Sequence, residues 1–341
     1  MSAPQQRTLF LTTSYPRHPG DFGGHFVRSH AQAEQADGHS VQVLAFGEPT
    51  ANAECSDPNI EVRWLGGGAL FGAPGVLPRL SERRSRLLLL VPAFLRALSA
   101  LWSSERYDRV IAHFLLLSGW PLGVWFGRRS GAALEVVAHG SDVRLFERLP
   151  VWLRLPIARD LAAAGARLRF VSEELRARMA RAVSAPELRR YVESQPVGAM
   201  PLDLPEVPDR ERARRELGIG SDEQVLLIVG RLIEGKRVRV ALGAALLLPE
   251  ARVVVIGSGP LRGELEEKLP ETQFLGELSH ELCLMWMSAA DALVCASRHE
   301  GAPTAVREAR SLGTPVIAVE AGDLLTWARA DEGIWVVGTH G

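Results

Sequence analysis

Short apolar runs alternate with helical patterns along almost the whole chain, and this alternation restricts the possible folds more than any other feature of the sequence. In the first half, runs typical of strands occupy residues 8–13, 41–46, 109–113, 134–138 and 167–171. Helical patterns lie between them, for example at residues 118–129 and 173–181. Strands that alternate with helices form right-handed βαβ units, whose parallel sheet is covered on both faces. The sequence therefore predicts an α/β fold.

A change in composition near the middle of the chain predicts two domains. Residues 195–210, QPVGAMPLDLPEVPDR, are rich in proline and have no helical period, which is typical of a linker. A second alternating series follows, with strand-like runs at residues 224–229, 251–257, 273–275, 292–295 and 316–319. We expect a Rossmann-like domain at residues 1–196, a linker at 197–210 and a second Rossmann-like domain at 211–341. In such a pair, ligands bind where the carboxyl ends of the strands face a central cleft between the domains.

Composition narrows the class of protein. The chain has 341 residues, of which 47% are hydrophobic, so it is long enough to bury the cores of two domains. Its formal net charge of −1 gives no reason to expect nucleic acid as a partner. The three cysteines have neither metal-site spacing nor the density of a disulfide framework, and the N-terminus lacks the pattern of a signal peptide. We therefore expect a cytoplasmic protein.

One apolar segment raises the question of membrane contact. Residues 87–102, LLLLVPAFLRALSALW, are too few to cross a bilayer and include Pro92 and Arg96. The interpretation that we favour is a buried helix of the first domain. Because Arg83, Arg84 and Arg86 precede this segment, the alternative is that residues 83–102 lie on an anionic membrane surface and make the protein membrane-associated.

Two turns in the second half have the composition of an anion-binding site. In VLLIVGRLIEGKRV, a buried strand ends at Gly230-Arg231, and Lys236 follows five residues later. A planar guanidinium and a mobile ammonium together suit a diphosphate, although a solvated charge cluster is the alternative. VVVIGSGPLRGEL reads as a strand, a turn containing Gly257 and Gly259, and a helix. With the preceding motif, this turn would close one wall of a nucleotide pocket.

The segment SRHEGAPTAVREARSLGTPVIA places one carboxylate just before an expected helix and another in its middle. Pro303 suits the first helical position and Gly313 suits the C-terminal cap. Glu300 precedes the helix N-terminus, where backbone N–H groups attract anions, and Glu308 lies at the edge of the buried stripe. We expect the two arginines of the helix to face water. The stripe comprises Ala305, Val306, Ala309 and Leu312, and the arginines are Arg307 and Arg310.

The first half contains weaker candidates. Gly23-Gly24 precede a helix that begins near His25, a geometry that lets backbone amides approach a phosphate or a sugar; an ordinary turn is the alternative. His139 follows a strand at its carboxyl end, where a polar side chain either faces the cleft or satisfies a local backbone group. His113 also lies at a strand end, and we interpret it as structural.

Taken in order, these motifs resemble those of the retaining glycosyltransferases of family 4, which have the GT-B fold. The resemblance covers residues 7 to about 322. It is most specific in the second half, through VGRLIEGK, VVVIGSGPLRGELE and ADALVCASRHEGAPTAVREARSLGTPVIA. Glu300 and Glu308 match the E-x7-E pair of this family. SYP…GG, HGSD and RFVSEELR in the first half match less specifically.

The resemblance implies an enzyme that moves a sugar, with retention of configuration, from a nucleotide-diphosphate sugar to an acceptor hydroxyl. It assigns Glu300 and His139 to the donor sugar, from opposite domains, and Glu308 to the nucleotide ribose. It assigns Arg231 and Lys236 to the donor diphosphate. The remaining substrate-binding candidates are Gly23, Gly24, Gly259, Gly301, Ala302 and Pro303. The resemblance implies neither a metal nor another cofactor, and it favours a UDP- or GDP-linked donor.

Three departures from the family pattern bear on function. Arg237 stands where many relatives have glycine, and the segment after the linker matches only loosely. The chain stops at Gly341, soon after the strand-like residues 333–337, whereas relatives continue into further helices, so the resemblance implies a shortened C-terminal domain. Two other functions stay open: a nucleotide-sugar epimerase on the same fold, and a non-catalytic sugar-nucleotide-binding homologue or partner subunit. The acceptor, whether a glycan, a lipid-linked group or a small molecule, is not identified.

Overall fold

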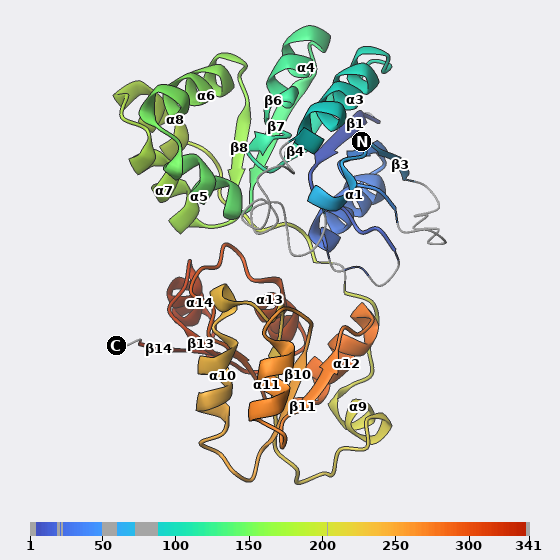
Figure 1. Ribbon diagram of the computed structural model, residues 1–341, viewed down its shortest axis with the longest axis vertical. Helices are drawn as coiled ribbons and strands as arrows, with labels where there is room; N and C mark the ends of the chain where they lie inside the picture. Colours follow the sequence, from blue (N-terminus) through green and yellow to red (C-terminus); the bar gives the residue numbers. More distant parts are fainter. Residues whose placement is uncertain are drawn as a thin grey trace. The chain divides into compact units, whose positions relative to one another are not determined.

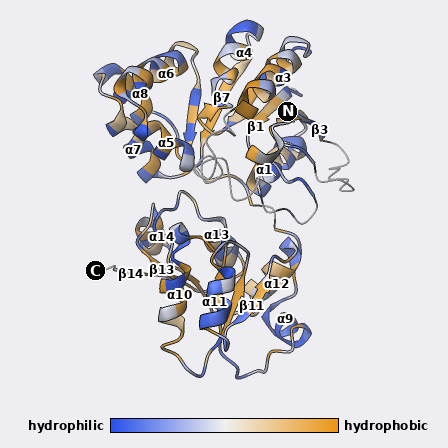
Figure 2. Cartoon of the chain, viewed as in Figure 1, coloured by the Kyte–Doolittle hydropathy of each residue, from blue (hydrophilic) through white to orange (hydrophobic). Residues whose placement is uncertain are grey.

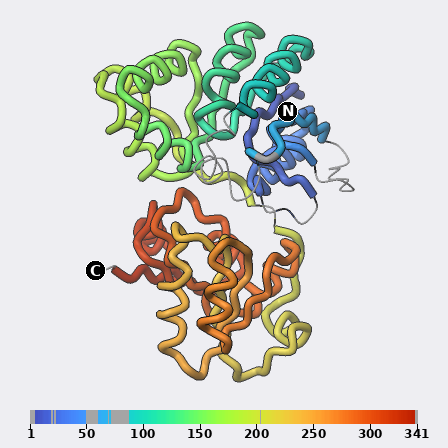
Figure 3. The backbone as a smooth tube through the Cα atoms, viewed as in Figure 1, coloured from blue at the N-terminus to red at the C-terminus, as the bar shows by residue number. Residues whose placement is uncertain are grey.

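The computed structural model describes residues 5–18, 21, 23–49, 60–71, 88–202 and 204–338. The chain divides into two compact units, Met1–Pro201 and Leu202–Gly341 (Figure 1). Colour changes in sequence order along the tube of Figure 3, so each unit is built from one continuous stretch of chain. The division falls inside the proline-rich segment 197–210.

The first unit contains a six-stranded parallel sheet in the order β3-β2-β1-β4-β7-β8. These strands are β1 (Arg7–Thr12), β2 (Ser40–Ala45), β3 (Glu61–Trp64), β4 (Arg109–His113), β7 (Ala133–Ala138) and β8 (Arg167–Phe170). The helices are α1 (His25–Ala36), α3 (Leu90–Trp102), α4 (Leu122–Ser130), α5 (Ser141–Arg148), α6 (Val151–Ala163), α7 (Glu173–Ala182) and α8 (Pro186–Glu193), and η1 (Gly68–Leu70) is a 3-10 turn. Strands β1, β4 and β7 are buried along nearly their whole length, because helices cover both faces of the sheet.

The second unit repeats this plan, with a six-stranded parallel sheet in the order β11-β10-β9-β12-β13-β14. Its strands are β9 (Val225–Val229), β10 (Arg252–Ile256), β11 (Gln273–Gly276), β12 (Ala292–Cys295), β13 (Val316–Val319) and β14 (Ile334–Val337). Its helices are α9 (Arg210–Glu216), α10 (Val238–Ala245), α11 (Arg262–Lys268), α12 (His280–Ala289), α13 (Thr304–Ser311) and α14 (Leu324–Ala330), and η3 (Glu234–Lys236) is a 3-10 turn.

The core of the second unit lies on both faces of its sheet. Val225 and Leu227 of β9 belong to one buried cluster, and Leu226 and Ile228 belong to the other, since successive side chains of a strand point to opposite faces. In Figure 2 the strand β7 is largely apolar, and the helices of both units contain both polar and apolar residues. The predicted α/β class with parallel sheets in two units is confirmed.

Two local predictions in the first unit are wrong in part. The helix expected at residues 118–129 begins only at Leu122, because Pro121 has no amide hydrogen to continue a helix toward its N-terminal side. A two-stranded ribbon of β5 (Leu116–Leu117) and β6 (Trp120–Pro121) precedes it. Residues 90–102 of the apolar segment form helix α3, but only one face of this helix is buried. Residue 87 and the arginines at 83, 84 and 86 lie outside the described residues.

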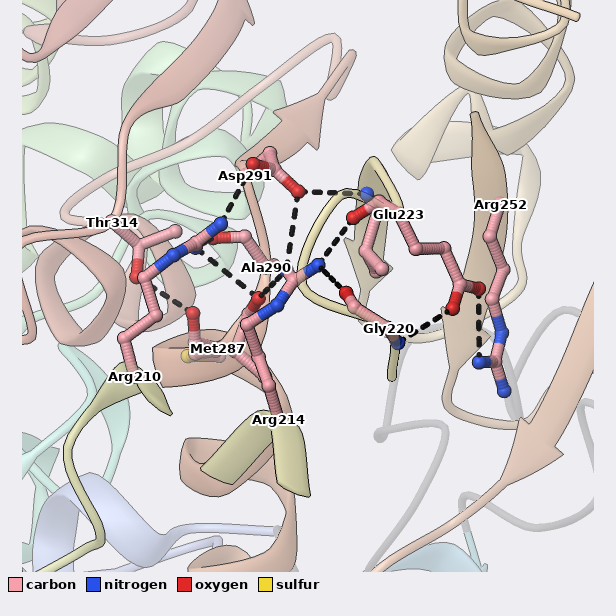
Figure 4. A network of polar contacts seen from close by, with 11 residues as sticks. Arg210, Arg214, Gly220, Glu223, Arg252, Met287, Ala290, Asp291 and Thr314 are labelled. Carbon is pink, nitrogen blue, oxygen red and sulfur yellow. Dashed lines mark hydrogen bonds and ion pairs between the residues drawn. The ribbon is translucent and has the colours of Figure 1, made fainter. Parts of the chain in front are cut away.

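A buried arginine fastens α9 to the rest of the second unit (Figure 4). Arg214 is 6% exposed and donates hydrogen bonds to the carbonyl oxygens of Ala289, at 2.9 Å, and Gly220, at 2.6 Å. It also donates to the carbonyl oxygen of Glu223 and to Asp291. These acceptors surround the guanidinium of Arg214, so its charge is stabilised although the side chain is buried.

Candidate functional site

In both sheets the order of strand addition reverses at a corresponding place. In each unit the first strand lies in the middle, the next two strands extend to one side, and the last three extend to the other. In open α/β sheets, ligands bind beyond the carboxyl ends of the strands at this switch point. The switch points lie between β1 and β4 in the first unit and between β9 and β12 in the second.

At the switch point of the second unit, a lysine contacts a buried glutamate. Lys236 ends the turn η3 after β9, and Glu300 lies in the loop after β12. The Nζ atom of Lys236 donates to Oε1 of Glu300 at 2.6 Å. The two loops are also joined through their backbones, because the amide of Arg298 donates to the carbonyl of Gly235 at 3.0 Å. The structure therefore brings together two of the predicted site residues.

Two arginines flank this ion pair. Arg231 is exposed directly after β9 and lies close enough to Glu300 for the two charges to interact. Arg237 follows Lys236 with φ 48°, in the left-handed region. An arginine in this conformation is strained, whereas glycine adopts it readily. The residue that departs from the family pattern therefore keeps a backbone conformation that glycine favours.

The turn after β10 packs directly on the turn after β9. A Cβ atom at Gly257 would lie 2.0 Å from the carbonyl oxygen of Gly230, and one at Gly259 would lie 2.4 Å from that of Leu232. The amide of Leu232 donates to the carbonyl of Ser258 at 2.9 Å. Only glycine allows two backbones to approach so closely. In this structure, Gly259 has a packing role beside the predicted site.

The loop that carries Glu300 continues through Gly301, Ala302 and Pro303. Pro303 is the N-cap of α13, so the prediction that it occupies the first helical position is wrong by one residue. Pro303 is buried, while Gly301 and Ala302 are half-buried. The carbonyl oxygen of Glu300 lies against the backbone of Gly322, where a Cβ atom would be only 2.5 Å away. This close contact restrains the position of the loop relative to the backbone around Gly322.

Glu308 is buried on α13, although the sequence placed it at the edge of the apolar stripe. It is 6% exposed, and its Oε1 atom is 2.9 Å from Nε2 of His280 at the start of α12. Sequence reasoning missed His280. The two residues are 28 positions apart, and no local pattern announces that α12 and α13 pack together.

The arginines of α13 do not face open water, so that prediction is wrong. Both Arg307 and Arg310 are half-buried. Arg310 makes two hydrogen bonds of 2.8 Å to Asp331, which follows α14, and donates to the carbonyl of Thr314 at 2.9 Å. Packing of α14 against this part of the unit supplies a partner that the helical wheel does not reveal. The helix closes as expected near Gly313, which has φ 79°.

In the first unit, Gly24 stands at the start of α1 with φ 84°. A Cβ atom there would lie 2.5 Å from the carbonyl carbon and oxygen of Ser14, in the loop after β1. The amide of Gly23 donates to Oδ1 of Asp21 at 2.8 Å. Close approach of the loop to the helix start thus requires glycine at position 24.

His139 follows β7 and is held on several sides. Its ring stacks on that of His113 with centroids 5.1 Å apart and lies 4.5 Å from the ring of Phe26. Its Nε2 atom is 2.9 Å from Nδ1 of His113. Burial lowers the pKa of His139 to about 3, so the ring is neutral at pH 7.

A buried aspartate of the HGSD motif, whose role sequence reasoning missed, orients this strand end. Asp142 accepts hydrogen bonds from the amides of His139, Gly140 and Leu115, at 3.1, 2.8 and 2.7 Å. Leu115 follows β4, so one carboxylate joins the ends of β4 and β7. The signal in the sequence was the placement of an acidic residue two positions after a glycine at a helix start.

In the second unit, the structure pairs Lys236 with Glu300 and, separately, His280 with Glu308. Among the described residues, no cluster of three or more His, Cys, Asp or Glu side chains is placed to hold a metal ion. Within the same ranges, no helix combines the length and the apolar character that a membrane span requires.

The two halves of the chain match two families of known proteins. Residues 23–193 match the family described as Glycosyl transferase 4-like domain, and residues 209–339 match the family described as Glycosyl transferases group 1. A putative teichuronic acid biosynthesis glycosyltransferase of Bacillus subtilis, TuaC, is 27% identical over 218 residues, covering 63% of this chain and 54% of that protein. The chain spans between 34% and 54% of the length of the first curated relatives that it matches.

Solved structures of similar fold cover almost the whole chain. Sucrose-phosphate synthase from Thermosynechococcus elongatus has a TM-score of 0.69 and 20% identity, over 98% of this chain and 87% of that chain. HepE of Anabaena, in complex with UDP and glucose, has a TM-score of 0.68 and 16% identity, over 98% of this chain and 86% of that chain. The fold is that of the GT-B glycosyltransferases. Because a family match covers half of the chain and a second one covers most of the remainder, the protein belongs to the group 1 glycosyltransferases of the GT4 type.

Proposed function

We propose that this protein transfers a sugar, with retention of configuration, from a nucleotide-diphosphate sugar to an acceptor hydroxyl. The observation that carries the proposal is the contact between Lys236 and Glu300 at the switch point of the second unit. A diphosphate needs a cation, and the hydroxyls of a sugar need a hydrogen-bond acceptor. This pair offers both groups within one contact distance.

The diphosphate is assigned to Lys236 and Arg231. Without a ligand, Lys236 neutralises Glu300 across 2.6 Å. Its ammonium has three hydrogens, so it can keep this bond while it donates to a phosphate oxygen. During transfer, negative charge grows on the leaving phosphate, and the two cations would stabilise that charge more strongly than the ground state.

The nucleotide ribose is assigned to Glu308. His280 occupies the Oε1 atom of this carboxylate, which leaves Oε2 to accept a hydrogen bond from a ribose hydroxyl. His280 thereby fixes the direction of the carboxylate. Burial of Glu308 keeps competing water away from the same oxygen.

The donor sugar is assigned to Glu300 and, from the first unit, to His139. The family resemblance provides no carboxylate nucleophile beyond these groups, so we propose that the acceptor attacks on the face from which the nucleotide leaves. The leaving phosphate then helps to remove the proton of the acceptor hydroxyl. Gly23 and Gly24 allow the loop before α1 to approach the ligand.

Thermal stabilisation by nucleotides tests the donor site. A ligand at a hundredfold excess over its Kd adds about 2.7 kcal/mol to the stability of the unit that it binds. UDP is tested first, because the similar HepE structure holds UDP and glucose, and GDP, ADP and dTDP follow. Glu308→Ala should remove most of the shift from the nucleoside diphosphate. Glu300→Ala should preserve this shift and abolish transfer.

One pattern of results would contradict the proposed site. If Glu308→Ala and Glu300→Ala each lower the melting temperature without ligand but leave the shift and turnover unchanged, the carboxylates are structural. Glu264→Ala on the exposed face of α11 is the control for loss of a surface carboxylate. Analysis of products from the preferred donor separates the three functions: a glycoside supports transfer, an epimerised donor supports the epimerase, and binding without either supports a non-catalytic protein.

We further propose that α3 contacts an anionic membrane surface. Most of the side chains of α3 that face the core are small, whereas several large apolar ones face outward. Val91, Leu95 and Trp102 are each more than half exposed. The guanidinium of Arg129 lies 3.8 Å from the centre of the Trp102 ring, which places a cation beside the apolar face. The buried residues of α3 are Ala93, Ala97, Ala100 and Leu101.

Co-sedimentation with vesicles tests this contact. Vesicles of phosphatidylglycerol and phosphatidylcholine should bind the protein, and pure phosphatidylcholine should bind it less. Replacing Val91 and Leu95 together by glutamate should lower binding by about tenfold or more, since each loses over 1 kcal/mol of apolar transfer energy. Leu247→Glu, at an even more exposed apolar position of the second unit, is the control. Equal losses in both variants would refute α3 as the contact.

A further inference from the structure

Three histidines form a continuous chain of hydrogen bonds through the first unit. Nε2 of His139 lies 2.9 Å from Nδ1 of His113, and Nε2 of His113 lies 3.1 Å from Nδ1 of His30. The rings come from three elements: the end of β7, the end of β4 and the middle of α1. This series of hydrogen bonds thus leads from His139, the proposed sugar contact, into the core of the first unit.

Two of the three rings are buried, the ring of His139 is half-buried, and all three are neutral at pH 7. His113 is fully buried and His30 is 4% exposed. Burial lowers the pKa of His30 to about 3, and it also holds the pKa of His113 well below its usual value. Phe10 packs against both rings, with centroids 5.3 Å from His30 and 5.6 Å from His113. A neutral imidazole carries one N–H group, so each ring donates through one nitrogen and accepts through the other.

Only two arrangements of the protons satisfy both hydrogen bonds. Either every ring carries its proton on Nε2, or every ring carries it on Nδ1. A mixed arrangement would set two N–H groups, or two lone pairs, against each other at about 3 Å. The tautomer of one ring therefore determines the tautomers of the other two.

The groups beside His30, at the end of the hydrogen-bond series away from His139, favour one of the two proton arrangements. Oε1 of Glu34 lies 3.9 Å from Nε2 of His30, one helical turn away on α1. Arg109 donates to the other oxygen of this carboxylate at 2.7 Å, so Glu34 is held in place beside His30. A negative charge beside Nε2 favours a proton on that nitrogen and disfavours a lone pair. The all-Nε2 arrangement is therefore the stable one.

We propose that Glu34, acting through His30 and His113, holds His139 in the neutral Nε2–H tautomer, so that Nδ1 of His139 presents a lone pair to a ligand hydroxyl. Among the described residues, no protein group hydrogen-bonds to this Nδ1. His113 is thus a positioning residue, although the sequence alone suggested only a structural role. A bare imidazole nitrogen accepts from a sugar hydroxyl and repels a phosphate oxygen, which fixes the part of the donor that His139 contacts.

This inference rests on the proposed function for the identity of the ligand, but the tautomer is measured without any ligand. In protein labelled with 15N-histidine, the two ring nitrogens of each residue give chemical shifts that distinguish a protonated from a bare nitrogen. At pH 7.5, His139 should have a protonated Nε2 and a bare Nδ1. Its signals are assigned by their loss in His139→Gln. A protonated Nδ1, or a charged ring, would overturn the inference.

Variants of the middle ring test its role. His113→Phe keeps an aromatic ring but removes both hydrogen bonds, so we expect roughly a tenfold to hundredfold loss in kcat/KM for the donor sugar. The Kd for the nucleoside diphosphate should not change, because His139 contacts only the sugar. His113→Asn retains an acceptor near the position of Nδ1 and should recover most of the activity. In Glu34→Gln, the loss of the charge should produce a mixture of His139 tautomers.

Phe10→Leu is the matched control, since it removes packing from the same two rings and leaves both hydrogen bonds in place. It should lower the melting temperature without changing the tautomer of His139 or kcat/KM. Equal losses in Phe10→Leu and His113→Phe would assign His113 a merely structural role and refute the inference. If the unsubstituted protein transfers no sugar, the proposed function fails, while the nitrogen shifts still decide the tautomer.

Discussion

The two units share one topology but carry different chemistry at the same place. Beside the switch point of the first unit, the ends of β4 and β7 bring together His113 and His139, imidazoles that burial keeps neutral. At the switch point of the second, the loops bring together charged groups, Lys236 with Glu300. The strand order determines where a ligand can approach, and the loop residues determine what it meets.

Exposure explains how the second unit supports its charges. The Lys236 side chain is 30% exposed, so its ammonium is still partly hydrated, whereas His113 has no exposed surface. A buried group without a counter-charge is most stable in its neutral form. We therefore expect the second unit to respond to loss of charge, and the first to respond to loss of packing and to acid.

The largest expected effect is that of Lys236→Ala on catalysis. Loss of the ammonium should lower kcat/KM by about 2–4 kcal/mol, which is roughly 30-fold to 900-fold, because the leaving phosphate loses its cation. Steady-state kinetics with the preferred donor measures this effect. Lys268→Ala removes an exposed lysine that pairs with Glu264, and it should be neutral. If the turnover of Lys236→Ala stays within twofold of the parent and its melting temperature is unchanged, the charged site of the second unit does not support catalysis as proposed.

The next effect concerns the two close backbone contacts, one in each unit. Gly24→Ala and Gly257→Ala should each destabilise their unit by about 1–3 kcal/mol, because the new Cβ would meet a backbone carbonyl and φ is positive at both positions. Gly131→Ala is the control, since φ is 75° there but no atom lies within 4 Å. Urea denaturation measures the changes. Similar losses at Gly24 and Gly131 would mean that close approach contributes nothing.

The third effect is a difference in acid sensitivity, which is spread over two pH units. The pKa of His30 and of His139 is about 3 in the folded chain, against 6.5 for the unfolded chain. Between these values the unfolded state binds more protons, so this contribution to stability is complete above about pH 6.5 and is lost as the pH falls. Each histidine adds a slope of at most about 1.4 kcal/mol per pH unit.

Hydrogen exchange between pH 7.5 and 5.5 can follow each unit separately, after correction for intrinsic exchange rates. Amides of β4 and β7 should lose protection more steeply with acid than those of β9 and β12. The groups around the histidine chain that set its environment are Arg109, Arg169, Glu34 and Glu135. Equal slopes in the two units would show that the histidines do not distinguish them.

The sequence by itself determined the α/β class, the parallel sheets and the main motifs at strand ends. These features are local: a buried parallel strand is a short apolar run, and a glycine before a helix records a close turn. Arg231, Lys236 and Glu300 were found in this way, since each follows a strand of the second unit by a few residues. Parallel strands bring their carboxyl ends to one edge, so the motifs gather there in any such fold.

Tertiary structure alone decided which side chains pair. Glu308 meets His280 because α12 packs beside α13, and Arg310 meets Asp331 because of the fold around α14. His30 joins His113 across 83 residues of sequence, and nothing in either neighbourhood indicates it. Helical periodicity gives the direction of a side chain but not the element that covers it. Burial, charge and tautomer depend on that covering element, and only the packed chain supplies it.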